Sequence, residues 1–170
     1  LVLAESREAA QAAARAVHVE YEELPSVFDP EEAIRPEAPQ LHDEYPGNIA
    51  GHHVVRKGDV ERGFAQADVI IERDYTTQLI EHAYIEPEAA AAVPGSVGGV
   101  TVYGSIQNPF SCRRAVAGVL RLPLAKVRVV QSHMGGSFGG KDEVMSTMCA
   151  RAALGAQLTG RPVKIVNTRE

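Results

Sequence analysis

The chain has 170 residues, of which 45% are hydrophobic and 23% are charged. This composition is typical of a globular domain and excludes disordered, collagen-like and coiled-coil proteins. No run of about 18 apolar residues occurs, so the sequence predicts no membrane span. The net charge is −10 over residues 1–85 and +5 over residues 86–170. The basic second half favours an anionic ligand, although a solvated surface explains the same charges.

The cysteines and arginines of the sequence indicate where the protein is located and which partners it can bind. Cys112 and Cys149 are too few for a disulfide framework and lack the spacing of zinc ligands. We therefore expect two small buried hydrophobic residues and a reducing, cytoplasmic location. The arginines are dispersed without interleaved aromatic residues, which argues against nucleic acid as a partner. No basic residues precede the apolar start at Leu1, so we expect no signal peptide. Leu1–Ala4 is an expected strand, and because the chain begins within it we interpret the chain as part of a longer protein.

The first part of the chain predicts a small α/β unit followed by a linker. Leu1–Ala4 is apolar, Ser6 is a candidate N-cap for an alanine-rich helix that ends near Ala16, and residues 17–21 alternate as in a strand. A strand, a helix and a strand in this order are typical of a crossover between parallel strands. The prolines between residues 25 and 51 predict a long extended linker.

The rest of the chain predicts a mixture of strands and helices. Asp59 is a candidate N-cap for a short helix that ends near Phe64. Period-two alternation between turn residues predicts strands, and apolar periodicity in two longer stretches predicts helices. The expected strands cover residues 54–57, 69–75, 86–93, 100–103, 126–131 and 163–166, and the expected helices cover residues 109–120 and 142–158. This order of elements indicates an α+β fold.

A glycine-rich loop between the strand at 126–131 and the helix at 142–158 carries the strongest functional signal. It reads Gly135-Gly136-Ser137-Phe138-Gly139-Gly140-Lys141. Glycines permit positive φ angles and close approach of the backbone to a ligand, and a strand–loop–helix arrangement directs N–H groups toward an anion. A simple turn needs only one or two glycines, so this loop favours ligand binding.

A nucleoside-triphosphate loop is the specific alternative. Gly135, Gly140 and Lys141 match the first seven positions of that motif in the same strand–helix context. The eighth position holds Asp142 instead of the serine or threonine that binds magnesium, and Phe138 is bulky for a loop that wraps phosphate oxygens. These departures favour a different ligand.

Several further motifs occur in order along nearly the whole chain. They are Gly58-Asp59-Val60, Ala67-Asp68-Val69, Glu81-His82-Ala83-Tyr84-Ile85-Glu86-Pro87-Glu88-Ala89, Gln107-Asn108-Pro109, Leu122-Pro123, Lys126-Val127-Arg128-Val129 and Gly160-Arg161-Pro162-Val163-Lys164. Together with the glycine-rich loop, they resemble the molybdenum-cofactor subunit of the xanthine dehydrogenase and aldehyde oxidase family. Residues 1–24 resemble the end of the small α/β domain that precedes the cofactor domain of that family.

The resemblance implies a domain organisation and a set of partners. Residues 1–24 would end a small α/β, hammerhead-like domain, residues 25–52 would form the proline-rich linker, and residues 53–170 would begin a molybdopterin-binding domain of mixed sheets and helices. The family's subunit is several times longer. The expected partners are the remainder of that subunit and the iron–sulfur and flavin (FAD) subunits that accept electrons.

The resemblance also implies a molybdenum–molybdopterin cofactor, whose pterin dithiolene holds the metal without sulfur ligands from the protein. Gln107 matches the glutamine whose amide donates to the apical oxo ligand. Gly136, Phe138 and Gly139 match residues packed on the metal and the pterin, and a core anchor under the loop is the other interpretation of Phe138. Ser137 replaces the commoner third glycine, so the backbone there must accept a Cβ.

The implied reaction is the oxidative hydroxylation of an aldehyde or an N-heterocycle, with a small molecule as substrate. Asp142 lies where purine-oxidising members have a substrate-binding glutamate, and a role as helix N-cap explains it equally well. No residue matches the family's catalytic glutamate, so we expect no catalytic residue in this chain and no turnover by the chain alone. A non-catalytic fragment with an assembly or scaffolding role is the remaining alternative.

A cluster of acidic residues and a histidine invites comparison with a metal site. Glu81, His82, Glu86 and Glu88 lie close together in the sequence. A zinc site needs three or four convergent ligands at a fixed spacing, which this segment lacks. We therefore expect ion pairing or packing here, and no direct ligation of a metal by side chains.

Overall fold

The computed structural model describes residues 1–169. The chain divides into two compact units, each described here by itself. The first combines Leu1–Ala16 with the chain from Gln78 onward, and the second is Val17–Thr77. In the described part of the chain, no helix is both long enough and apolar enough to cross a membrane.

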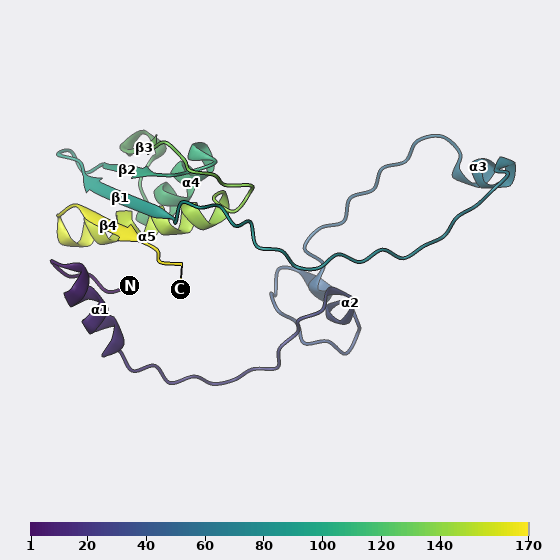
Figure 1. Cartoon of the computed structure of the whole chain (residues 1–170), viewed down its shortest axis with the longest axis horizontal. Helices are drawn as coiled ribbons and strands as arrows, with labels where there is room; N and C mark the ends of the chain where they lie inside the picture. Colours follow the sequence, from purple (N-terminus) through teal and green to yellow (C-terminus); the bar gives the residue numbers. More distant parts are fainter. Residues whose placement is uncertain (170) are drawn as a thin grey trace. The chain divides into compact units, whose positions relative to one another are not determined.

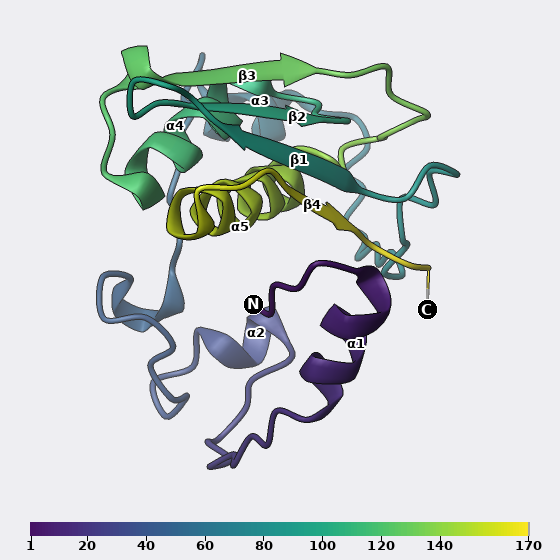
Figure 2. The same cartoon turned by 90° about the vertical axis from the view of Figure 1, so that its left-hand side faces the viewer.

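A four-stranded mixed sheet forms the centre of the first unit (Figures 1 and 2). Its strands are β1 (Ala89–Pro94), β2 (Val100–Gly104), β3 (Val127–Gln131) and β4 (Val163–Val166), arranged in the order β3-β2-β1-β4. β1 is antiparallel to both β2 and β4, whereas β2 and β3 are parallel. β3 and β4 are therefore the edge strands, and each carries one exposed cation, Arg128 and Lys164 respectively.

Two α-helices and a short 3-10 helix lie in the connections between the strands. α4 (Pro109–Leu120) and the short 3-10 helix η2 (Leu124–Lys126) lead from β2 to β3, and α5 (Glu143–Thr159) leads from β3 to β4. α4 begins where the side chain of Asn108 accepts a hydrogen bond from the Ser111 backbone N–H at 3.2 Å. α5 ends at Gly160, whose φ of +65° suits a residue without a Cβ. These capping residues fix the helix bounds close to those predicted.

The core lies on the face of the sheet that is covered by α4 and α5. Alternate residues of β1 and β2 face this core, and small alanine side chains along α5 let the helix approach the strands closely. The central members are Ala90, Ala92, Val100, Val102, Ile106, Cys112, Val116, Met145, Cys149, Ala152, Ala153 and Ala156. This arrangement confirms the predicted α+β class.

Both cysteines are fully buried free thiols, as predicted. The neighbouring Cys112 thiol and burial both raise the pKa of the Cys149 thiol. Cys149 therefore stays protonated at neutral pH and packs as a small hydrophobic residue.

The first sixteen residues add a helix to this unit. α1 (Arg7–Arg15) begins at Ser6, whose hydroxyl accepts from the Ala9 N–H at 3.1 Å, so the predicted cap is confirmed. Before the helix, Leu3 lies against Gly155 of α5, and Glu5 pairs with Arg161 at 2.9 Å. The strand expected at residues 1–4 is wrong. That segment forms no backbone hydrogen bonds with a neighbouring strand in the described part of the chain, and contacts α5 through its side chains.

The second unit contains only short helices joined by extended chain: α2 (Pro30–Ala33), the 3-10 helix η1 (Pro46–Asn48) and α3 (Val60–Gln66). Asp59 caps α3 as predicted, since its carboxylate accepts from the Arg62 N–H at 3.0 Å. The side-chain amide of Asn48 donates to the carbonyls of Ala33 and Pro39 and holds the proline-rich stretch together.

Three predicted strands in this unit are wrong. Residues 17–21, 54–57 and 69–75 are extended but unpaired in the described part of the chain. Their apolar side chains face water, with Tyr21 85% and Ile71 75% exposed. A period-two pattern makes a strand only where a neighbouring strand accepts its hydrogen bonds and covers its apolar face.

Met145 provides a test of the packing between α5 and the sheet. Its side chain is fully buried against β2 near Gly104. We expect Met145→Ala to lower the free energy of unfolding by about 2–5 kcal/mol, because it leaves a cavity. Met145→Leu keeps the volume and is expected to cost less than about 1.5 kcal/mol. Urea denaturation of both variants checks this, and equal losses would contradict close packing at this position.

Candidate functional site

The chain segments with functional signals meet at one end of the sheet. β2 and β3 are parallel, so the segments that follow them, residues 105–108 and 132–141, leave the same edge. The Ser132 N–H donates to the Gly104 carbonyl at 2.8 Å and holds these exits together. β1 begins at this edge because it is antiparallel to β2, which brings residues 81–88 there. Ligands of open α/β sheets bind outside the carboxyl ends of parallel strands, which is the position found here.

The glycine-rich loop adopts an unusual backbone conformation at this edge. Gly136, Phe138 and Gly139 have φ angles of +94°, +54° and +100°. Within residues 1–169, the backbone N–H groups of residues 136–139 donate to no other residue. Successive N–H groups in turns that contain left-handed residues form concave donor surfaces, which suit anionic or oxygen-rich ligands. The loop therefore has donors to offer to a ligand.

The glycines are also required by close packing of the loop on residues 82–86. A Cβ on Gly140 would lie 2.6 Å from Tyr84 Cε1, and a Cβ on Gly135 would lie 2.8 Å from Glu86 Cβ. The sequence predicted that the backbone of the loop approaches a ligand closely. The structure shows that Gly135 and Gly140 first allow the loop to pack closely on Tyr84 and Glu86 of the same chain. Phe138 points outward and is 77% exposed, so its interpretation as a core anchor is wrong.

An ion pair between a buried lysine and a partly exposed glutamate joins the loop to the segment before β1. The Lys141 side chain is fully buried, and its Nζ lies 2.6 Å from Glu86 Oε2 and 4.7 Å from the centre of the Tyr84 ring. Glu86 Oε2 also accepts from the Gly135 N–H at 2.7 Å. Burial raises the pKa of Glu86, but the hydrogen bonds from Lys141 and Gly135 outweigh it, so the net shift of the Glu86 pKa is downward.

This ion pair contradicts the nucleoside-triphosphate alternative. In that motif the lysine reaches out to the phosphates of the ligand. Here Lys141 is removed from solvent and already neutralised by Glu86. The lysine therefore serves the fold of the loop, and the match to seven positions of the motif does not indicate phosphate binding.

Gln107 lies beside the loop and is tied to it through two groups. Its backbone N–H donates to the Lys141 carbonyl at 3.2 Å, and its side-chain Oε1 accepts from the Ser137 hydroxyl. Ser137 Oγ in turn accepts from the Lys141 N–H at 3.1 Å. The Nε2 group of Gln107 makes no hydrogen bond in the described part of the chain. The structure thus brings together Gln107 and the loop, as expected from the sequence.

Asp142 follows the loop at the N-cap position of α5. Its φ and ψ are −83° and −76°, and its side chain caps no backbone N–H. The prediction of an N-cap is confirmed in position and wrong in chemistry, since the carboxylate makes none of the hydrogen bonds that define the cap. The side chain is half-buried beside the loop, and its role in substrate binding stays a prediction.

Further residues that the sequence did not single out support the site. Arg169 donates to the backbone carbonyls of Tyr84 and Ile85, and the Asn167 N–H donates to the Glu88 carbonyl at 3.0 Å. The chain after β4 thereby fixes the segment against which the loop packs. A sequence offers no signal for such contacts, because they join residues about eighty positions apart.

The acidic residues before β1 do not converge on one point. Glu81 and His82 lie 4.0 Å apart and are exposed, whereas Glu86 faces Lys141 and Glu88 accepts from the Asn167 side chain at 3.3 Å. Within residues 1–169, no three histidine, cysteine, aspartate or glutamate side chains are placed to hold a metal ion.

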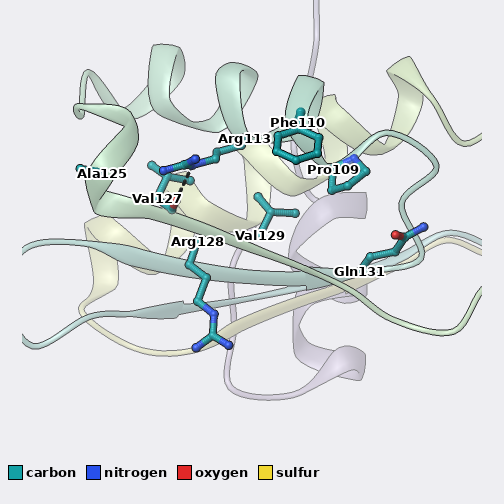
Figure 3. A pocket seen from close by; sticks show the side chains of 8 residues that line it. All are labelled: Pro109, Phe110, Arg113, Ala125, Val127, Arg128, Val129 and Gln131. Atoms are coloured by element: carbon teal, nitrogen blue, oxygen red, sulfur yellow. Dashed lines mark hydrogen bonds between the residues drawn. The ribbon is translucent and has the colours of Figure 1, made fainter.

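A shallow groove of about 430 Å³ lies along the edge strand β3 (Figure 3). It is lined mainly by apolar side chains from β3 and the start of α4, including Phe110 and Val129. Arg113 is tied to the Val127 carbonyl at 2.9 Å, and Arg128 points away from α4 (Figure 3). Its lining includes no acidic, histidine or cysteine side chain.

Comparison with known proteins agrees with the fold. A family model described as the molybdopterin cofactor-binding domain matches residues 41–170. The chain is 43% identical to a probable xanthine dehydrogenase subunit of Bacillus subtilis (strain 168), over 99% of this chain and 22% of that protein. It is 39% identical to the nicotinate dehydrogenase large molybdopterin subunit of Eubacterium barkeri, over 100% of this chain and 39% of that protein.

A solved structure gives the same result. The aldehyde oxidoreductase from Desulfovibrio gigas is similar with a TM-score of 0.84 and 31% identity, over 97% of this chain and 18% of that chain. The chain belongs to the molybdopterin cofactor-binding domain family, which confirms the resemblance found in the sequence. It spans only about a fifth to two fifths of the length of the curated relatives described above.

The Glu86–Lys141 pair predicts a dependence of stability on pH. Because the pKa of Glu86 is lowered in the folded state, its stabilising effect is present above its unfolded pKa of about 4.5 and is lost as the pH falls through the folded value. Urea denaturation between about pH 3 and pH 7 is expected to show a free energy of unfolding that rises with pH. Glu86→Gln is expected to reduce this rise.

The same substitution tests the strength of the pair at neutral pH. We expect Glu86→Gln to cost about 1–3 kcal/mol, less than for a fully buried pair because about a third of the Glu86 side chain is exposed. The matched control is Glu5→Gln, which breaks the exposed pair with Arg161 and is expected to cost less than about 1 kcal/mol. Equal effects of the two variants would contradict a special role for Lys141.

The positive φ angle of Gly136 predicts that replacing it with alanine destabilises the fold, unlike the same change at a helical glycine. Gly136→Ala is expected to lower the free energy of unfolding by more than about 1 kcal/mol, because its φ is +94° and its Cβ would crowd Tyr84. Gly118 lies in α4 with no atom near the position of a Cβ, so Gly118→Ala is expected to raise stability by about 0.5–1 kcal/mol. Thermal or urea unfolding of both variants measures the contrast.

Proposed function

We propose that this chain is part of a molybdenum hydroxylase subunit, in which it binds the molybdopterin cofactor. The arrangement of the glycine-rich loop carries the proposal. Within residues 1–169, the four N–H groups at residues 136–139 have no partner. They lie beside Gln107, at the carboxyl ends of two parallel strands, in a member of a molybdopterin-binding family. The donor surface fits the oxygen-rich pterin cofactor, because every group offered is neutral and donates a hydrogen bond.

Each residue of the site has a separate proposed role. Gly136 and Gly139 admit the cofactor to the backbone, and Phe138 places an exposed apolar ring at the mouth of the loop, where it would exclude water. Gln107 presents its Nε2 donor to the ligands of the metal without adding charge. The cofactor supplies the redox chemistry, and the protein binds and orients it.

The substrate class is an aldehyde or an N-heterocycle. The relatives named above include a xanthine dehydrogenase subunit, a nicotinate dehydrogenase subunit and an aldehyde oxidoreductase, which between them cover both classes. We propose Asp142 as the substrate contact, because its carboxylate lies next to the loop and caps no helix N–H. A catalytic base is expected from the remainder of the subunit.

The proposed partners follow from the same family. They are the remainder of the molybdopterin subunit and iron–sulfur and flavin subunits that carry electrons to an acceptor. Within this chain we propose that residues 1–24 end a small α/β domain, residues 25–52 form a linker and residues 53–170 begin the cofactor domain. The two reduced thiols, Cys112 and Cys149, support a cytoplasmic location.

The proposal predicts the effect of removing the Gln107 amide. In the complete enzyme, Gln107→Ala is expected to slow reduction by substrate by about 10- to 100-fold, because a neutral donor near the metal is lost. The measurement is the rate of cofactor reduction in rapid mixing, with molybdenum content determined in parallel. Gln157→Ala, which removes an exposed amide on α5, is the matched control and is expected to leave the rate unchanged.

Metal analysis of the unmodified complete enzyme tests the function as a whole. Stoichiometric molybdenum is expected. Its absence would overturn the proposed function and favour an assembly or scaffolding role. Magnesium-dependent ATP binding that Lys141→Ala abolishes would also contradict the proposal.

A further inference from the structure

Ser137, Lys141 and Gln107 form a closed ring of hydrogen bonds at the centre of the loop. The Lys141 N–H donates to Ser137 Oγ at 3.1 Å, the Ser137 hydroxyl donates to Gln107 Oε1, and the Gln107 backbone N–H donates to the Lys141 carbonyl at 3.2 Å. Ser137 is only 6% exposed, so water does not replace these partners. The ring connects a buried serine to the exposed side chain of Gln107.

The chemistry of the serine hydroxyl fixes which end of the Gln107 amide faces it. A hydroxyl has one proton to donate and lone pairs to accept with. Because Ser137 Oγ already accepts from the Lys141 N–H, its proton is free for a second partner, and the carbonyl oxygen of the amide can accept it. If the amide were reversed, its NH2 group would donate to Oγ and the serine proton would be left buried without an acceptor, which is costly.

The orientation of the amide decides what Gln107 offers to a ligand. With Oε1 held by Ser137, the Nε2 group faces away from the serine and is a free donor within the described residues. Without this restraint, the orientation of the amide depends on whichever other donors and acceptors surround it. The serine hydroxyl thus selects a donor over an acceptor.

We propose that Ser137 is a positioning residue, which fixes the Gln107 amide so that its NH2 group and not its carbonyl faces the cofactor site. This inference rests on the proposed function. Ser137 does not itself reach the ligand, because its hydroxyl is buried and used twice within the ring. It acts through Gln107, and its substitution therefore has an effect only while Gln107 is present.

The test is a double-mutant cycle in the complete, metal-loaded enzyme, with Ser137→Ala, Gln107→Ala and the double variant. Ser137→Ala is expected to slow reduction by substrate by about 2- to 10-fold, the factor by which one hydrogen bond shifts an equilibrium. In the Gln107→Ala background the same change is expected to have no further effect. Thr159→Ala removes a hydroxyl that donates to the Gly155 carbonyl at the far end of α5 and is the matched control, with an unchanged rate.

A spectroscopic readout separates positioning from general damage. The electron paramagnetic resonance spectrum of the partly reduced metal is expected to change in Ser137→Ala and in Gln107→Ala alike, while molybdenum content and melting temperature stay near those of the unmodified enzyme. If the spectrum and the rate are both unchanged in Ser137→Ala, the inference about Ser137 is overturned and the proposed function still stands. Additive effects in the double variant overturn it too, because Ser137 would then act independently of Gln107.

Two further outcomes are distinguishable from these. If Ser137→Ala loses its metal or its fold, the hydroxyl is a structural support of the loop and the inference is overturned, whereas the proposed function stands. If the unmodified complete enzyme contains no molybdenum, the proposed function is overturned and the inference with it.

Discussion

The burial of one charge determines how the site is built. Lys141 is withdrawn from water, and such a charge is tolerated only with a partner close by and its hydrogen bonds satisfied. Glu86 supplies that partner and at the same time accepts from Gly135, so the two ends of the loop converge on one carboxylate. Two segments about fifty-five positions apart are thereby brought into a fixed register. Gly135 and Gly140 then follow, because a Cβ would collide with Glu86 at the first position and with Tyr84 at the second.

Lys141 also fixes the position of Gln107. The Lys141 side chain holds Glu86, its N–H holds Ser137, and its carbonyl holds the backbone of Gln107. A lysine at the end of a glycine-rich loop suggests a charge offered to a ligand, yet here all three of its polar groups are used within the protein. The free donors of the site are instead neutral N–H groups, which suits recognition of a ligand by hydrogen bonding more than by net charge.

The sequence predicted the elements that local chemistry determines. α4 was found with its observed bounds from its apolar periodicity, and the glycine-rich loop was located from its run of glycines. The Asn108 side chain that caps α4 was seen only in the structure. The strands expected at residues 17–21 and 69–75 were not found, because a strand depends on a partner that no local pattern supplies. The role of Ser137 was missed for a related reason. Its value lies in two contacts that exist only after folding, and in the sequence it is merely a substitution for glycine.

The edges of the sheet have a consequence for behaviour in concentrated solution. β3 and β4 each leave a row of backbone groups without a neighbouring strand in the described part of the chain, which is a template for aggregation. Each of these strands also carries a solvated cation at its second position, Arg128 in one and Lys164 in the other. Charged side chains on an edge strand disfavour its pairing with a strand of another copy. These two side chains therefore act as gatekeepers against the formation of intermolecular β-structure.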